Sequence, residues 1–205
     1  MFALVESGSI TKMLNGNKGI QIGDLKYPRA IYTLWTEAER NAIGIYTVEY
    51  DNSNKKDEKW YINTNQSYAF ADNKVTASYG SATAKAHADT TWTQKQIDDG
   101  DAPDGADTDT IATEGLKTIL IRQVKSIAEG ELNKTDWYIT RKAEKNTAIP
   151  SAITTHRDAV RSKQAAMETA ITNASDTPAL ETLYTFTEQE DGSVTRPLGE
   201  LPTLE

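Results

Sequence analysis

Residues 98–109, with the sequence DDGDAPDGADTD, divide the chain into two parts of different character. Six aspartates, two glycines and one proline within twelve residues leave almost no apolar surface to bury. The stretch therefore predicts a linker at 98–110, between a β-rich N-terminal domain at 1–97 and a helical region at 111–183. A β-hairpin and C-terminal tail are expected at 184–205, which makes the predicted fold class α+β.

Strand patterns occupy most of the N-terminal domain. Residues 2–6 and 10–14 flank Ser7-Gly8-Ser9 and predict a hairpin, and residues 45–50 alternate with period two. One short helix is expected, because Thr36-Glu37-Ala38-Glu39 has the form of a capping box and Gly44 can end the helix. Further strands are predicted at 19–22, 60–63, 67–71 and 75–79, and a short alanine-rich helix is expected at 82–88.

Helical spacing dominates after the aspartate-rich stretch. Leu116, Leu120, Val124 and Ile127 lie on one face of a helix predicted at 111–131. A second helix is expected from Thr135, as its N-cap residue, to just before Asn146.

The third predicted helix has Pro150 as its first residue, a position where the missing N–H of proline costs nothing. A fourth helix is expected to start at Thr177-Pro178, and the final hairpin to turn at Asp191-Gly192. One apolar stripe at helical spacing runs along the third helix, through Ile153, His156, Val160, Met167 and Ile171. These helices predict a helical hairpin or bundle, within one chain or between chains.

Composition limits the classes of partner. The formal net charge is −8, and the basic runs at 55–56 and 142–145 are interleaved with acidic residues, so no nucleic-acid partner is expected. The chain has no cysteine, which suits a protein made in a reducing cytoplasm. The apolar run at 1–6 is too short for a signal peptide, and no apolar run approaches the roughly 20 residues of a membrane span, so no membrane contact is expected.

No motif for catalysis or for a cofactor is recognisable. The two histidines, His87 and His156, are far apart, and no HExxH, G-x-S-x-G or phosphate-loop pattern occurs. The aspartates of 98–109 suggest calcium as an alternative to a solvated linker, but their spacing does not fit an EF-hand. The prediction is a non-enzymatic protein with no catalytic, cofactor-binding or metal-binding residues.

A polysaccharide hydrolase is the distant alternative, because such enzymes need only two suitably separated carboxylates. Aromatic residues on adjacent predicted strands could line a sugar cleft or could pack in the core, and core packing is the preferred interpretation. These residues are Trp60, Tyr61, Tyr68, Phe70 and Tyr79.

Two groups of segments resemble proteins encoded beside the tail-fibre genes of tailed bacteriophages. In the C-terminal part these segments are TDWYITRKAE at 135–144, TAIP at 147–150 and RDAVR at 157–161. In the N-terminal part they are IGDLKYP at 22–28 and WTEAERNAIGI at 35–45. The family commonly has an aromatic residue before the first arginine of the third helix, where this chain has His156.

The resemblance implies a structural role for the C-terminal motif. Thr135 is expected to cap the second helix, Asp136 to favour its positive N-terminus, and Trp137 to fill the gap between two helices. The arginines of the motif, Arg141, Arg157 and Arg161, are expected to form exposed ion pairs with the neighbouring helix. Pro150 completes the motif.

The function implied by the resemblance is a structural component of a phage tail, made in the host cytoplasm and located in the virion. Its expected partners are other tail or tail-fibre proteins, with several copies or a homo-oligomer in the tail. The alternative is a tail-fibre assembly chaperone that is absent from the mature particle.

Overall fold

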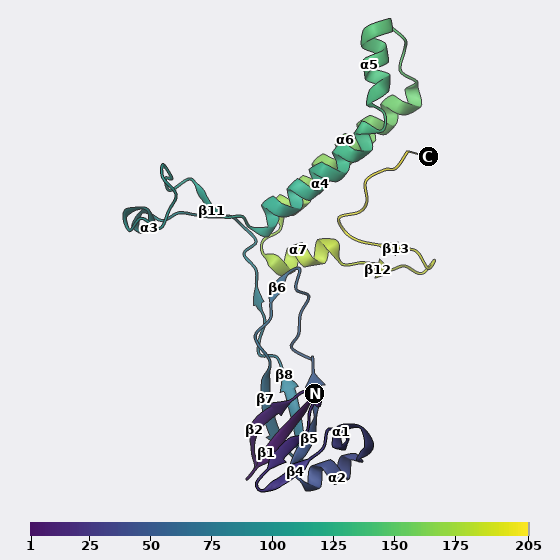
Figure 1. Ribbon diagram of the computed structural model, residues 1–205. Helices are drawn as coiled ribbons and strands as arrows, with labels where there is room; N and C mark the ends of the chain where they lie inside the picture. Colours follow the sequence, from purple (N-terminus) through teal and green to yellow (C-terminus); the bar gives the residue numbers. More distant parts are fainter. Residues whose placement is uncertain (205) are drawn as a thin grey trace. The chain divides into compact units, whose positions relative to one another are not determined.

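The computed structural model describes residues 1–204, which form an α+β fold divided into two compact units, Met1–Thr83 and a second that begins at Ala84 (Figure 1). Strands dominate the first unit, and helices dominate the second unit, which ends in a β-hairpin. The predicted fold class is therefore confirmed.

The first unit is built on a mixed five-stranded sheet with strand order β2-β1-β5-β8-β7. Neighbouring strands are antiparallel except for β5 and β8, which are parallel. The edge strands β2 and β7 also contact each other, so the sheet curls on itself. The strand bounds are β1 Phe2–Glu6, β2 Ser9–Leu14, β5 Ile45–Asp51, β7 Ser67–Ala71 and β8 Lys74–Ser78.

The two faces of this sheet carry separate apolar cores, because side chains alternate along each strand. One core contains Leu4, Ile31 and Ile45, and the short helices α1 (Ile31–Leu34) and α2 (Glu37–Ala42) belong to this side. The other core contains Ala3, Val5, Val48, Val75 and Ala77, with Phe70 packed against it. A shorter ladder of β3 (Ile20–Ile22) with β4 (Leu25–Tyr27) lies within the unit. β6 (Tyr61–Ile62) pairs with β9 (Thr83–Ala84), the strand in which the first unit ends and the second begins.

Local sequence signals account for the turns of this unit. Thr36 accepts a hydrogen bond from the Glu39 N–H, and the Glu39 carboxylate accepts one from the Thr36 N–H, which is the predicted capping box. Asp72 and Asn73 both have positive φ, as the tight turn between β7 and β8 requires. The structure has two short helices here, whereas one was predicted, because the segment after Pro28 forms the single turn α1.

The second unit begins with an excursion of the chain. The strand β10 (Thr90–Thr91) pairs with β11 (Ile111–Thr113), and the short helix α3 (Gln94–Asp98) and the aspartate-rich stretch lie between them. The segment predicted as a linker at 98–110 is therefore a loop inside the second unit. The boundary between units falls at Thr83/Ala84 rather than at residue 97.

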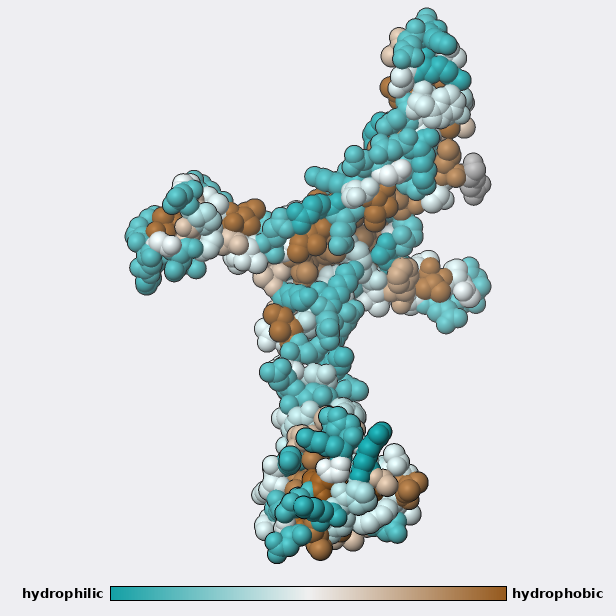
Figure 2. Space-filling model, in the orientation of Figure 1, coloured by the Kyte–Doolittle hydropathy of each residue, from teal (hydrophilic) through white to brown (hydrophobic). Residues whose placement is uncertain are grey.

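Two long helices form the body of this unit, α4 (Leu116–Asn133) and α6 (Ser151–Asn173). They pack against each other, with α5 (Asp136–Lys145) between them in the chain, and apolar side chains gather along the pair in Figure 2. The predicted apolar stripe of α6 is buried at all its positions. Of the predicted apolar face of α4, Leu116, Leu120 and Val124 are buried, but Ile127 is 60% exposed. Pro150 is the N-cap residue of α6 rather than its first residue, a shift of one position.

Two expectations at the start of this unit were wrong. Residues 82–88 are not helical, because the carbonyl oxygens of Ala86 and His87 accept hydrogen bonds from the N–H groups of Leu116 and Lys117 at the start of α4. The helix predicted from residue 111 begins at Leu116, since Ile111–Thr113 pairs as β11.

The C-terminal segment folds back on the helices. It comprises α7 (Thr177–Tyr184), β12 (Thr187–Glu188), β13 (Val194–Thr195) and a tail in which Leu198 is buried. Arg196 lies over the rings of both Tyr184 and Phe186, each 5.2 Å from the guanidinium carbon, and this contact links the predicted hairpin to α7. No helix in residues 1–204 has the length and apolar character needed to cross a bilayer.

Candidate functional site

The turn between α4 and α5 is the first part of the site. The helix α4 ends at Asn133, and α5 begins at Asp136 after only Lys134 and Thr135. Thr135 is fully buried, and its hydroxyl donates to the Leu132 carbonyl oxygen at 2.9 Å. The predicted side-chain cap by Thr135 is absent, because this hydroxyl bonds backwards to the end of α4 instead of forwards to α5.

A buried arginine from α6 closes this turn. The Arg157 Nη1 atom donates to the Leu132 carbonyl oxygen at 2.7 Å, to the Thr135 hydroxyl at 2.7 Å and to an Asp136 carboxylate oxygen at 2.8 Å. The Arg157 side chain is 10% exposed. The predicted ion pair between Arg157 and a neighbouring helix is therefore present, with Asp136 of α5, but the expectation that the arginine would be exposed was wrong. Carbonyl oxygens at the C-terminal end of α4 carry partial negative charge, so they are good acceptors for a guanidinium.

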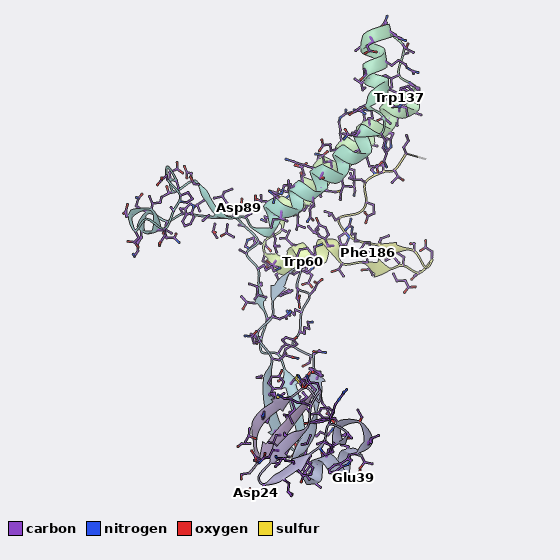
Figure 3. All side chains as sticks on the ribbon, viewed as in Figure 1. Asp24, Glu39, Trp60, Asp89, Trp137 and Phe186 are labelled. Atoms are coloured by element: carbon purple, nitrogen blue, oxygen red, sulfur yellow. The ribbon has the colours of Figure 1, made fainter. Side chains whose placement is uncertain are left out.

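The resemblance implied that Trp137 fills a gap between two helices, and this was wrong. The side chain lies on α5 and is 52% exposed (Figure 3). Its ring stacks on that of Tyr138, with the centroids 3.7 Å apart and the planes inclined by 31°. The guanidinium of Arg141 lies 4.8 Å from the Trp137 ring centroid and 5.2 Å from that of Tyr138. Arg141 therefore makes a cation–π contact on its own helix, where an ion pair with another helix was predicted.

The remaining residues of the predicted motif lie apart from this cluster. Arg161 is exposed and bonds to Asp158 on its own helix at 3.3 Å, and within residues 1–204 it has no ion pair with a neighbouring helix. Of the predicted residues, Thr135, Asp136 and Arg157 meet at the α4–α5 turn, while Trp137 and Arg141 meet on the surface of α5. Pro150 serves only the start of α6.

Sequence reasoning missed two participants, the Leu132 carbonyl oxygen and the Tyr138 ring. A main-chain acceptor leaves no trace in residue identity, so no pattern could identify Leu132. Tyr138 stands next to Trp137 and three residues before Arg141, and that spacing places the three on one side of a helix.

The result is an exposed apolar and basic surface on a fixed support, called here the α5 face. It consists of Trp137, Tyr138, Arg141, Lys142 and Lys145. Trp137 is 52% exposed, and aromatic and arginine side chains are the residue types enriched at protein–protein contacts.

A second polar cluster fixes the excursion that holds the aspartates. Oxygens of the Asp89 carboxylate accept from the Gly115 N–H at 2.6 Å and from the Thr118 hydroxyl at 2.8 Å. These two donors hold the pKa of Asp89 below its usual 3.8. Asp89 therefore caps α4 from a distance of 26 positions in the sequence and closes the base of the loop.

The other candidate residues for chemistry lie as follows. Trp60 and Tyr61 are 3% and 5% exposed, and Phe70 packs against Tyr46 with ring centroids 4.8 Å apart, so the preferred interpretation of core packing is confirmed for these three. His156 is buried on α6. No group of three or more histidine or acidic side chains within residues 1–204 is arranged to hold a metal ion.

Comparison with known proteins returns no family model, no curated protein and no solved structure that matches this chain.

Proposed function

We propose that this chain is a non-enzymatic structural component of a bacteriophage tail, present in several copies and held in the virion by contacts with other tail or tail-fibre proteins. The observation that carries the proposal is the α5 face, which displays Trp137 to solvent while Arg157 fixes the turn beneath it. The resemblance of residues 135–161 to phage tail-region proteins supports the choice of partners.

The support under α5 matters for such a role. A contact surface loses less conformational entropy on binding when its backbone is already held in place. The Arg157 bonds to three oxygens of the α4–α5 turn hold the start of α5, and α6 supplies them from 21 to 25 residues further along the chain. The α5 face is thus displayed by a fixed element rather than by a loop.

A tail-fibre assembly chaperone is the second candidate, and the same exposed face favours it. A chaperone also needs an accessible apolar contact surface, but it leaves before the particle is complete. The two candidates differ in whether the protein is retained in mature virions. A carboxylate-based polysaccharide hydrolase is the distant third candidate.

The test is mass spectrometry of density-purified phage particles, with peptide counts scaled to the major tail protein. A recovery of several copies per particle supports the structural role. If the protein is absent from mature particles but is required for them to become infectious, the result supports the chaperone instead. Reducing sugar released from host polysaccharide, and lost on single carboxylate substitutions, would favour the hydrolase.

A matched pair of variants tests the α5 face in the same experiment. Trp137→Asp places a charge on the α5 face, and Leu34→Asp places one at another exposed apolar residue, 79% exposed in the first unit. We expect Trp137→Asp alone to reduce incorporation into particles. Equal incorporation of both variants would show that the α5 face is not the contact surface.

A further inference from the structure

We propose that copies of this chain associate head to tail, with the α5 face of one molecule against the aspartate-rich loop at 98–109 of the next. The inference rests on the proposed function in one respect, since a tail component in several copies needs a contact between copies. Its test uses the purified protein alone, so the two proposals can fail separately.

The α5 face combines apolar area with positive charge. Trp137, Arg141 and Lys145 recur every four residues and therefore form one stripe along the helix, with Lys142 beside it. Arg157 neutralises the Asp136 carboxylate beneath the face. With Arg141, Lys142, Lys145 and Arg157 counted against Asp136 and Glu144, this region has a formal charge of +2, whereas the whole chain has −8.

The loop at 98–109 offers the complementary chemistry. It contains six aspartates and no basic residue, and all six side chains are exposed. Ile111, 48% exposed at the end of the loop, supplies an apolar side chain for Trp137. The loop is the most acidic stretch of the chain and the α5 face is locally basic, so their attraction is a charge complementarity.

The loop and the α5 face of one molecule lie at opposite ends of α4. The Asp89 bond to Gly115 fixes the loop base at the first turn of α4, and α5 follows the last turn (Figure 1). The 18 residues of α4 separate these ends by roughly 27 Å at 1.5 Å per residue. A second copy is therefore needed to bring an aspartate loop to the α5 face.

The contact joins two different surfaces, so it is heterologous and leaves one free loop and one free α5 face in every dimer. Such contacts continue into a ring or an open chain of copies, depending on the rotation between neighbours.

The experiment is sedimentation velocity of the full-length protein at increasing concentration, at roughly 0.05 M and 0.5 M salt. We expect association that grows with concentration and weakens at high salt. A variant of the α5 face, Lys142→Glu with Lys145→Glu, is called here the tip variant. It should weaken association about tenfold or more. A loop variant, in which Asp101, Asp104 and Asp109 become Asn, should have the same effect.

The control variant combines Lys12→Glu with Lys26→Glu, two exposed lysines of the first unit. It changes the net charge as much as the tip variant does, and it should associate like the wild type.

Mixing the two defective variants gives the decisive result. The loop variant retains an intact α5 face and the tip variant retains an intact loop, so the mixture should form dimers and nothing larger. A protein that stays monomeric at every concentration, an association that neither variant weakens, or a mixture without dimers would each overturn the proposal.

Discussion

Replacing Arg157 by Met should destabilise the second unit by about 2–3 kcal/mol. The substitution keeps a long apolar side chain and removes the donor to Leu132, Thr135 and Asp136. Nη1 has two N–H groups for these three acceptors, so about two hydrogen bonds of full strength are lost. A hydrogen bond to a charged group contributes about 1.5–3 kcal/mol, but the Asp136 carboxylate is 52% exposed, and its share is screened to less than about 1 kcal/mol.

The assay is urea unfolding followed by circular dichroism at the helix band, together with hydrogen exchange of the amides in α5. Arg161→Met is the matched control, one turn along the same helix, where the arginine bonds to the exposed Asp158. The control should change the free energy of unfolding by less than about 0.5 kcal/mol. A similarly small change in Arg157→Met, with normal protection of α5, would refute the view that Arg157 fixes the turn.

Three further outcomes follow from the structure. Gly115→Ala should destabilise the second unit severely, because the new Cβ would lie 2.2 Å from the backbone carbonyl carbon of Ala88. Gly130→Ala places its Cβ in open space within α4, so it should stabilise the unit by about 1 kcal/mol. Thermal unfolding of both variants measures the difference. Trp137→Ala should cost less than about 1 kcal/mol in urea unfolding, since the side chain is 52% exposed, and a larger loss would mean that it packs inside the unit. The pKa of Asp89 is depressed on folding, so its stabilisation is present above its usual 3.8 and is lost as pH falls through the lower folded value. Acid unfolding of Asp89→Asn should therefore show a weaker pH dependence than that of the wild type, and identical profiles would contradict the assigned bonds.

Features set by neighbouring residues could be predicted from the sequence. The capping box at Thr36, the hairpin across Ser7-Gly8-Ser9 and the buried stripe of α6 each depend on spacing within one element. Their geometry follows from backbone hydrogen bonding and helical periodicity, which residue types report directly.

The position of Trp137 could not be predicted in this way. An indole beside a helix start suits either a helix–helix gap or an exposed contact surface, and the choice depends on which elements meet. Here the neighbouring Tyr138 and Arg141 cover part of the indole. Arg157 was misjudged for a related reason, because the oxygens that stabilise its buried charge come together only when the chain reverses after α4.

The boundary between the units was misplaced because a low apolar content shows only that a stretch has no core of its own. It does not show whether the stretch connects two units or forms a loop within one of them. The hydrogen bonds from the N–H groups of Leu116 and Lys117 to the carbonyl oxygens of residues 86 and 87 determine this, and residue types do not predict such backbone bonds.

The closure of the loop base by Asp89 gives the chain a site for insertions. The hydrogen bond between Asp89 and Gly115 does not involve the residues between them. The intervening segment can therefore lengthen without disturbing α4 or the helices packed against it. Each doubling of a flexible loop costs only about 0.6 kcal/mol in closure entropy. A short epitope or a fluorescent reporter domain placed near Gly105, where the residue has positive φ and open space around it, should leave the rest of the fold intact.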